Sequence, residues 1–176
     1  AKTDGAHRAL SAAFAAHDIE RAYLALVWGR PRQARGTIEG AIGRDPRNRK
    51  KMAVVAKGGK AAVTHYRVER RFGEVAALVE CRLETGRTHQ IRVHLAHIGH
   101  PAIGDALYGR ARRRRAQALP PDLASTIQDL GRQALHAHVL GFRHPVSREQ
   151  LSFRSELPDE LKHLVDRFGT VRAPNA

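Results

Sequence analysis

The sequence predicts an α+β protein with one domain, residues 1–176. Short apolar stretches typical of strands alternate irregularly with segments of helical periodicity, which fits neither a helical bundle nor a regular βαβ repeat. No internal repeat and no linker divides the chain. Its 176 residues can bury roughly two thirds of the surface of the unfolded chain, so the fold needs no disulfide or metal.

The first elements expected are a helix and a buried strand. Residues 6–16 are rich in alanine, and Leu10 and Phe14 lie four apart, as in a short core stripe. Asp4 or a neighbour can cap this helix. Residues 21–29 are aromatic and apolar over the length of a strand, which predicts a buried strand.

The next part of the chain predicts a short strand, a basic loop and a hairpin. The strand includes residues 37–39, and the loop spans residues 44–51. Residues 52–56 and 61–70 flank two adjacent glycines, which supply the positive φ that a tight turn demands. We therefore expect these two segments to pair with each other.

An alternating strand over residues 75–84 precedes a helix. Thr88 is a good N-cap, and the helix should run to about Ile98, with Ile91 and Leu95 on its core side.

The last third of the chain predicts a flexible basic loop, a strand pair and a final helix. The loop covers residues 110–122, and the strands cover 134–142 and 150–155. Pro158 opens the helix. Its apolar face consists of Leu161, Leu164, Val165 and Phe168.

The charge of the chain predicts a polyanionic partner. With 31 Lys and Arg against 17 Asp and Glu, the formal net charge is +14. Nucleic acid is favoured over a membrane, because the sequence shows neither a basic amphipathic helix with exposed large apolar residues nor a lipidation signal. Without a signal-peptide pattern or a spanning segment, we expect a cytoplasmic protein.

The sequence predicts no metal site. Cys81 is the single cysteine and lies within an apolar alternation, so we interpret it as a small buried residue. His94, His97 and His100 stand three apart, but such positions drift around a helix and no carboxylate lies among them.

The densest polar cluster is the run from Thr85 to His94, where a strand ends and a helix begins. A helix start offers free N–H groups and a partial positive charge, and Arg87, His89 and Arg92 add to this. Such a site suits a phosphate or a carboxylate. On the residues alone, a generic basic helix start accounts for the pattern equally well.

Several motifs, in this order, resemble the RluA/RluD family of ribosomal RNA pseudouridine synthases. The most specific is Thr-Gly-Arg-Thr-His-Gln-Ile-Arg, beginning at Thr85. The others are Arg-Ala-Tyr-Leu-Ala from Arg21, Ala-Val-Thr-His-Tyr from Ala62, Gly-His-Pro from Gly99, Gly-Asp-x-x-Tyr-Gly from Gly104 and Leu-His-Ala from Leu135. The resemblance covers residues 1–168 and is nearest to the branch that modifies large-subunit ribosomal RNA.

The resemblance implies a mixed, mainly antiparallel, curved sheet flanked by helices, and an isomerase that needs no cofactor. In this family a carboxylate starts the cleavage of the glycosidic bond, and C5 of the uracil is then joined to the ribose. The catalytic aspartate lies in a His-Arg-Leu-Asp-x-x-Thr-Ser-Gly motif, which this sequence does not contain. We therefore expect an inactive fragment of a longer parent enzyme, incomplete at its N-terminus.

Two residues take catalytic roles by this resemblance. Tyr23 corresponds to the tyrosine that packs against the flipped base, and Arg92 to the arginine that pairs with the catalytic aspartate. Without the motifs, strand packing would account for Tyr23 and a surface ion pair for Arg92. Asp105 could substitute as nucleophile, but the family has this aspartate beside the catalytic one, so we interpret it as a loop cap.

We expect further residues to contact RNA: Arg87, Thr88, His89, Gln90, His94, Leu135, Arg44, Arg47, Arg49, Lys50 and Lys51. The partner expected is ribosomal RNA, bound by a monomer. The alternatives are a non-catalytic RNA-binding module with the same basic surface and, more weakly, a basic assembly protein that coats RNA.

Overall fold

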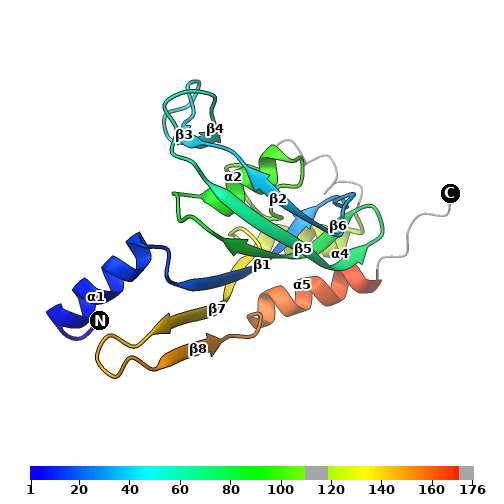
Figure 1. Cartoon of the computed structure of the whole chain (residues 1–176). Helices are drawn as coiled ribbons and strands as arrows, with labels where there is room; N and C mark the ends of the chain where they lie inside the picture. The colour runs from blue at the N-terminus through cyan, green and yellow to red at the C-terminus, as the bar shows by residue number, and fades with distance from the viewer. Residues whose placement is uncertain (110–118, 171–176) are drawn as a thin grey trace.

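The computed structural model describes residues 1–109 and 119–170. Its centre is a six-stranded sheet in the order β2-β5-β6-β1-β7-β8 (Figure 1). Among the described residues every pairing in this sheet is antiparallel, whereas the resemblance implied a mixed sheet. The strands are β1 (Glu20–Trp28), β2 (Arg35–Glu39), β5 (Val63–Phe72), β6 (Ala76–Leu83), β7 (Leu135–Arg143) and β8 (Gln150–Arg154). The predicted α+β class is confirmed.

Helices cover both faces of the sheet. Because side chains alternate along a strand, β6 sends Ala76 and Leu78 to one face and Ala77 and Val79 to the other, and all four are buried. The first pair packs with α4 (Pro121–Asp129) and α5 (Asp159–Thr170), and the second with α2 (Gln90–His97).

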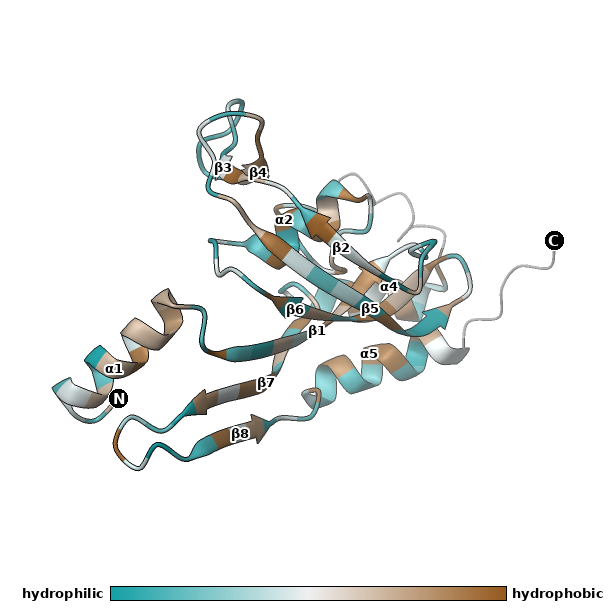
Figure 2. Cartoon of the chain, viewed as in Figure 1, coloured by the Kyte–Doolittle hydropathy of each residue, from teal (hydrophilic) through white to brown (hydrophobic). Residues whose placement is uncertain are grey.

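The C-terminal helix forms as predicted. Figure 2 shows α5 with alternating hydrophilic and hydrophobic bands. Its apolar residues Leu161, Leu164, Val165 and Phe168 are all buried. The ring of Phe168 meets that of Trp28 edge to face, with 6.4 Å between centroids. The predicted strands around residues 21–29, 75–84, 134–142 and 150–155 are also present, as β1, β6, β7 and β8.

The first helix differs from the prediction. α1 (Asp4–Ala15) forms and is capped by the Thr3 side chain, but it contains no buried residue. Phe14 is 46% exposed. The helix projects from one end of the sheet (Figure 1), so the proposed core stripe at Leu10 and Phe14 is wrong.

The predicted hairpin around Gly58 and Gly59 is wrong in its partners. β4 (Met52–Val54) pairs with β3 (Ile42–Arg44) in a separate ribbon, while β5 joins the main sheet. A Cβ added at Gly59 would lie 2.7 Å from the Val55 side chain and 3.0 Å from the backbone of Ala41. The glycine therefore allows a close backbone approach beside β3.

Two boundaries also differ. Thr88 does not cap α2, whose N-cap is His89, in a left-handed conformation with φ of 58°. The loop expected over residues 110–122 falls partly outside the described residues, from 110 to 118. In the described remainder, Leu119 is buried and Pro121 begins helix α4, which was not predicted. Proline at the first helical position loses no hydrogen bond, because that N–H has no partner within a helix.

Candidate active site

The turn between β6 and α2 is fixed by one buried glutamine. Gln90 Oε1 accepts hydrogen bonds from the Thr85 hydroxyl at 2.7 Å and from the Arg87 amide at 2.9 Å. Its Nε2 donates to Val63 O at 2.9 Å and to the Thr64 hydroxyl at 3.0 Å. A single side chain thus fastens the start of α2 to strand β5.

Behind Gln90 lies His94, which is fully buried. Its Nδ1 is 2.9 Å from the Thr64 hydroxyl, and its Nε2 is 3.3 Å from Gly40 O. Because Gly40 O can only accept a hydrogen bond, Nε2 carries the proton, and Nδ1 of the neutral ring accepts from the Thr64 hydroxyl. Burial lowers the pKa of His94, so the ring is neutral at pH 7.

Arg92 points to the other side of α2 and meets Asp105. Its Nε and Nη2 donate to the two carboxylate oxygens at 2.7 and 2.8 Å, in a bidentate pair. The Asp105 side chain is completely buried and that of Arg92 is 15% exposed. Two of the five guanidinium N–H groups are used, and the planar fork is held in one orientation.

Asp105 is itself held by the loop that carries it. Its Oδ1 also accepts from the backbone amides of Leu107 and Tyr108, at 2.9 and 3.0 Å. Burial alone would raise the pKa of Asp105, but the hydrogen bonds from Arg92 and these amides outweigh it and hold the pKa below its usual range. The predicted loop-capping role is confirmed, and the ion pair with Arg92 is an addition.

Tyr108 links this pair to the ribbon of β3 and β4. Its hydroxyl accepts from the Met52 amide at 3.0 Å and lies 3.0 Å from His89 Nδ1. The Arg92 guanidinium lies 5.0 Å from the centroid of its ring. Burial, and then the positive charges of Arg92 and Arg44, lower the pKa of His89. His89 is therefore a neutral ring beside Arg92 at pH 7.

Tyr23 and Leu135 lie on the sheet face that α2 covers. Tyr23 is half-buried on β1, at an irregularity in the register between β1 and β7. Both side chains pack against the cluster that contains Ile91 and Leu95 of α2. The aromatic residue expected to hold the base and the helix that carries Arg92 thus share one side of the sheet.

The basic loop predicted at residues 44–51 joins β3 to β4, at the tip of the projecting ribbon (Figure 1). Asp45 Oδ1 accepts from the amides of Arg47 and Asn48, and the Asn48 side chain accepts from the amide of Lys50. These bonds give the loop a defined shape. The exposed cations are Arg44, Arg47, Arg49 and Lys50, and the partly buried Lys51 lies 6.0 Å from the Tyr108 ring.

A family model described as RNA pseudouridylate synthase matches residues 1–97, more than half of the chain. The chain belongs to the RNA pseudouridylate synthase family. The ribosomal large subunit pseudouridine synthase D of Zymomonas mobilis is 48% identical over 93% of this chain and 50% of its own length. The protein of that name from Xanthomonas campestris is 47% identical over 94% of this chain and 49% of its own length. This chain spans about half the length of these curated relatives.

Solved structures of the family share the fold. The human RNA pseudouridylate synthase domain containing 1 superposes with a TM-score of 0.70, at 26% identity, over 99% of this chain and 75% of its own. The human RNA pseudouridylate synthase domain containing 4 superposes with a TM-score of 0.72, at 26% identity, over 99% of this chain and 70% of its own.

For this member of the pseudouridylate synthase family, two expected RNA contacts need correction. Gln90 and His94 are buried, and their polar atoms are bonded within the protein, so neither side chain is placed to contact RNA. Arg92, whose expected partner is the catalytic aspartate, holds Asp105 among the described residues. Arg87 and the exposed Thr88 stay at the surface of the turn, and Arg87 Nε donates to Ala61 O.

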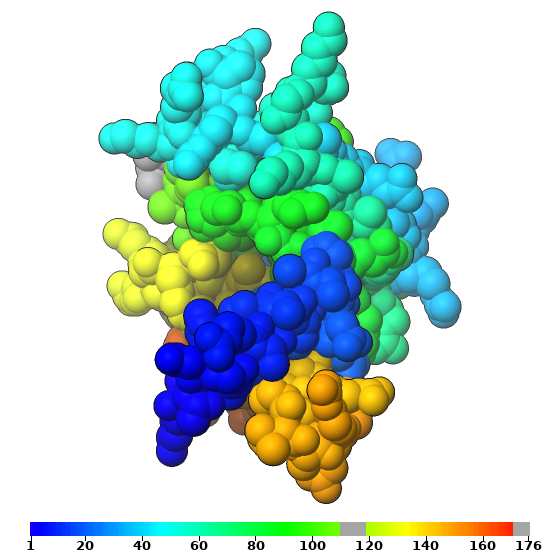
Figure 3. All heavy atoms as spheres, turned by 60° about the vertical axis from the view of Figure 1, so that its left-hand side comes forward, coloured from blue at the N-terminus to red at the C-terminus, as the bar shows by residue number. Residues whose placement is uncertain are grey.

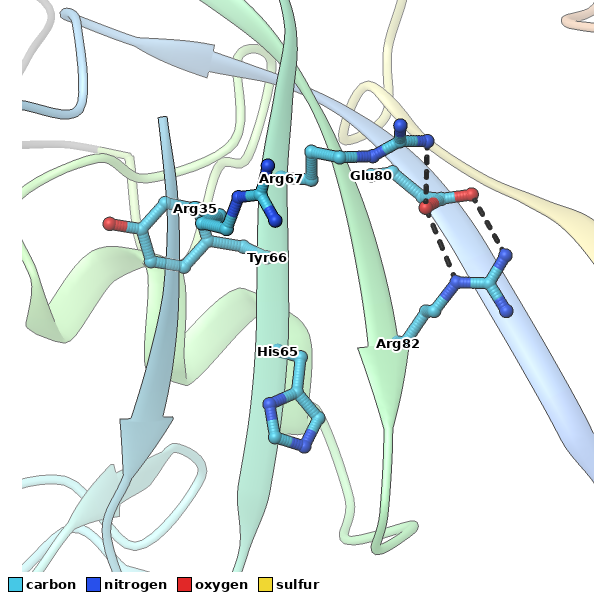
Figure 4. Close-up of a pocket in the computed structure, with 6 residues that line it drawn as sticks. All are labelled: Arg35, His65, Tyr66, Arg67, Glu80 and Arg82. Carbon is cyan, nitrogen blue, oxygen red and sulfur yellow. Dashed lines mark hydrogen bonds and ion pairs between the residues drawn. The ribbon is translucent and has the colours of Figure 1, made fainter. Parts of the chain in front are cut away.

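A polar pocket lies on the sheet face opposite α2 (Figure 4). Its lining residues are Arg35, His65, Tyr66, Arg67, Glu80 and Arg82. Glu80 is 7% exposed, and its oxygens are bonded by Arg67, Arg82 and His138. Burial raises the pKa of Glu80, but the hydrogen bonds from Arg82 and His138 and the charges of Arg82 and Arg67 outweigh it and lower the pKa overall. Glu80 is therefore a structural ion and no free base.

Sequence reasoning missed Tyr108 and Thr64 as parts of the site. Tyr108 lay within the motif Gly-Asp-x-x-Tyr-Gly, which could have pointed to it. Thr64 is fully buried and bonded to both Gln90 and His94, but no local pattern marks a threonine in a strand as a partner of a helix 26 residues away.

The described part of the chain contains no helix that could cross a membrane. Within the same residues, no three His, Cys, Asp or Glu side chains are grouped to hold a metal ion. Cys81 is buried, and burial raises the pKa of its thiol to about 12, in keeping with a structural residue.

Proposed function

We propose that this chain is the larger part of the catalytic domain of an enzyme that converts uridine to pseudouridine in large-subunit ribosomal RNA. The observation that carries the proposal is the Arg92–Asp105 pair at the start of α2, on the sheet face that also holds Tyr23 and Leu135. The names of the relatives support the choice of RNA.

The proposed chemistry assigns a role to each side chain. The target uridine leaves its stack, and the ring of Tyr23, with Leu135 beside it, packs against the flipped base. The C1′–N1 bond breaks, the uracil turns, and a C1′–C5 bond forms while C5 loses its proton and N1 gains one. Tyr23 assists the removal of the C5 proton, and no cofactor takes part.

A carboxylate must start this reaction, and we propose that polypeptide outside these 176 residues supplies it. Asp105 and Glu80, the buried carboxylates among the described residues, are each engaged by arginine. Arg92 keeps N–H groups beyond the two bonded to Asp105, and these orient and ionise the incoming carboxylate. On this account the chain by itself is inactive.

In this proposal the basic loop and the turn before α2 bind the RNA. Arg44, Arg47, Arg49, Lys50 and Lys51 contact phosphates, and Arg87, Thr88 and His89 lie nearer the target nucleotide. Tyr108 joins the two regions through its bonds to Met52 and His89. We propose that the enzyme works as a monomer in the cytoplasm.

The test of this function is tritium release from RNA labelled at C5 of uridine, incubated with the product of the complete gene. Large-subunit ribosomal RNA should lose its tritium at one or a few sites, and small-subunit RNA should lose none above background. Release from small-subunit RNA alone would refute the substrate, and no release from either would refute the enzyme.

A non-catalytic RNA-binding module is the second candidate, favoured by the engagement of both buried carboxylates and by the ordered basic loop. That function predicts RNA binding that weakens steeply with salt, because phosphate contacts release counterions, together with no tritium release from any RNA.

A further inference from the structure

One arginine beside the candidate site has two buried nitrogens that form no hydrogen bond within the described part of the chain. Nε and Nη2 of Arg21, on β1, are buried, and neither has a hydrogen-bond acceptor among the described residues. The guanidinium carbon lies 5.7 Å from the centroid of the Phe14 ring of α1. A Cβ added at Gly86 would lie 2.7 Å from Nη1, so the group lies between α1 and the turn that leads into α2.

In two other arginines of this chain, the guanidinium edge formed by Nε and Nη2 binds a carboxylate. Arg92 uses Nε and Nη2 to hold both oxygens of Asp105, and Arg82 uses Nε and Nη2 to hold both oxygens of Glu80. This edge presents two parallel N–H groups that match a carboxylate. A buried guanidinium without a countercharge is costly, which makes an acceptor for Arg21 a requirement of the functional protein.

Exposed apolar side chains lie on the same face of the sheet as Arg21. In the sheet register Arg21 lies opposite Leu140, and Leu140 lies opposite Phe153, so the three side chains share one face. Leu140 is 39% exposed and Phe153 54%, and Phe14 covers the guanidinium from α1. Figures 1 and 3 place α1 beside the β7–β8 hairpin at the same end of the molecule.

This surface, formed by Phe14, Arg21, Leu140 and Phe153, fits a polypeptide better than RNA. Its rim is apolar, and such a rim packs against apolar side chains of a polypeptide better than against the charged phosphates of an RNA strand. Single exposed apolar residues are common, but a group of them on one face is typical of an interaction surface.

We propose that the surface is the docking site of a polypeptide segment of the same protein that lies outside these 176 residues. The segment covers the apolar rim and places one carboxylate against Nε and Nη2 of Arg21. The matching relatives are about twice as long as this chain, so they contain polypeptide that can fill this role. The inference concerns assembly of the fold and does not depend on the proposed reaction.

The experiment compares the thermal stability of Arg21→Met and Arg35→Met in the product of the complete gene. Removing one partner of a buried ion pair should lower the Tm of Arg21→Met by roughly 4–10 °C. Arg35 is an exposed arginine on β2, and its variant should stay within about 1 °C of the wild type. In the 176-residue chain alone, Arg21→Met should leave the Tm unchanged or raise it, since it removes buried donors without acceptors.

Equal Tm values for the two variants of the complete product would overturn the proposal. So would a fall of about one in the salt-dependence slope of RNA binding by Arg21→Met without loss of Tm, because Arg21 would then be a phosphate contact. Neither readout involves isomerisation, so failure here and failure of the proposed function are separate results.

Discussion

Replacing Arg92 with alanine in the product of the complete gene should reduce tritium release from labelled ribosomal RNA by about 10²–10³-fold or more. In the proposed mechanism the variant removes the fork that orients the catalytic carboxylate, and losses of this size follow the removal of one preorganised electrostatic group from an active site. RNA affinity should change little, because Arg92 is one of 31 basic residues and is only 15% exposed.

Two further variants separate catalysis from folding. Arg92→Lys keeps a positive charge beside Asp105 but lacks the bidentate fork, so its turnover should fall while its fold is retained. Arg82→Lys makes the same exchange at the bidentate pair with Glu80 on the opposite face, and should keep near-normal turnover. Equal turnover by both lysine variants would show that Arg92 has no special role in the reaction.

Replacing Asp105 with alanine should destabilise the protein by about 3–5 kcal/mol, the cost of breaking a buried ion pair from one side. The variant leaves Arg92 without its partner and takes the acceptor from the Leu107 and Tyr108 amides. Chemical denaturation measures the loss. Asp166→Ala, at an exposed position of α5, is the matched control and should stay within about 0.5 kcal/mol.

The Asp105 pair also predicts a pH dependence of stability. Its folded pKa lies below the ordinary value of the unfolded chain, so the unfolded state binds the proton more readily. The contribution is complete above about pH 4–5 and is lost as the pH falls through the folded pKa. Asp105→Asn should flatten the acid limb of the stability curve, and an unchanged limb would contradict the assignment.

Periodicity alone located much of the fold. β1, β6, β7 and β8 are continuous apolar or alternating stretches bounded by turn residues, and α5 carries a clear apolar face. Such elements are specified by their own residues, because each must bury one face or both. The six-stranded order could not be derived from these patterns, since it depends on pairings between distant segments.

Where the predictions were wrong, contacts between distant parts of the chain determine the pairing or burial of the element. β4 has the composition of a hairpin strand, but its side chains pack with Val93 of α2 and with Tyr108, which turns it towards β3 and away from β5. α1 has the amphipathic pattern of a core helix, yet none of its residues is buried and Phe14 is 46% exposed.

The motif pointed to the candidate site, but it did not reveal which partner each side chain binds. Thr85 to His94 reads as a uniform polar run, whereas Gln90 and His94 face the interior and Arg92 faces Asp105. Neighbouring residues of a helix point to different sides because the helix repeats every 3.6 residues. Which side is buried is decided by the partners on β5 and in the loop after α2.

We propose that this chain holds the tyrosine and arginine of a pseudouridine-forming site but depends on a carboxylate from further polypeptide. The most direct test is the rate of tritium release from labelled large-subunit ribosomal RNA by the 176-residue chain, compared with the product of the complete gene at equal concentration. We expect turnover by the complete product and none above background by the chain. Comparable rates from both would contradict it, since the catalytic carboxylate would then lie among these 176 residues.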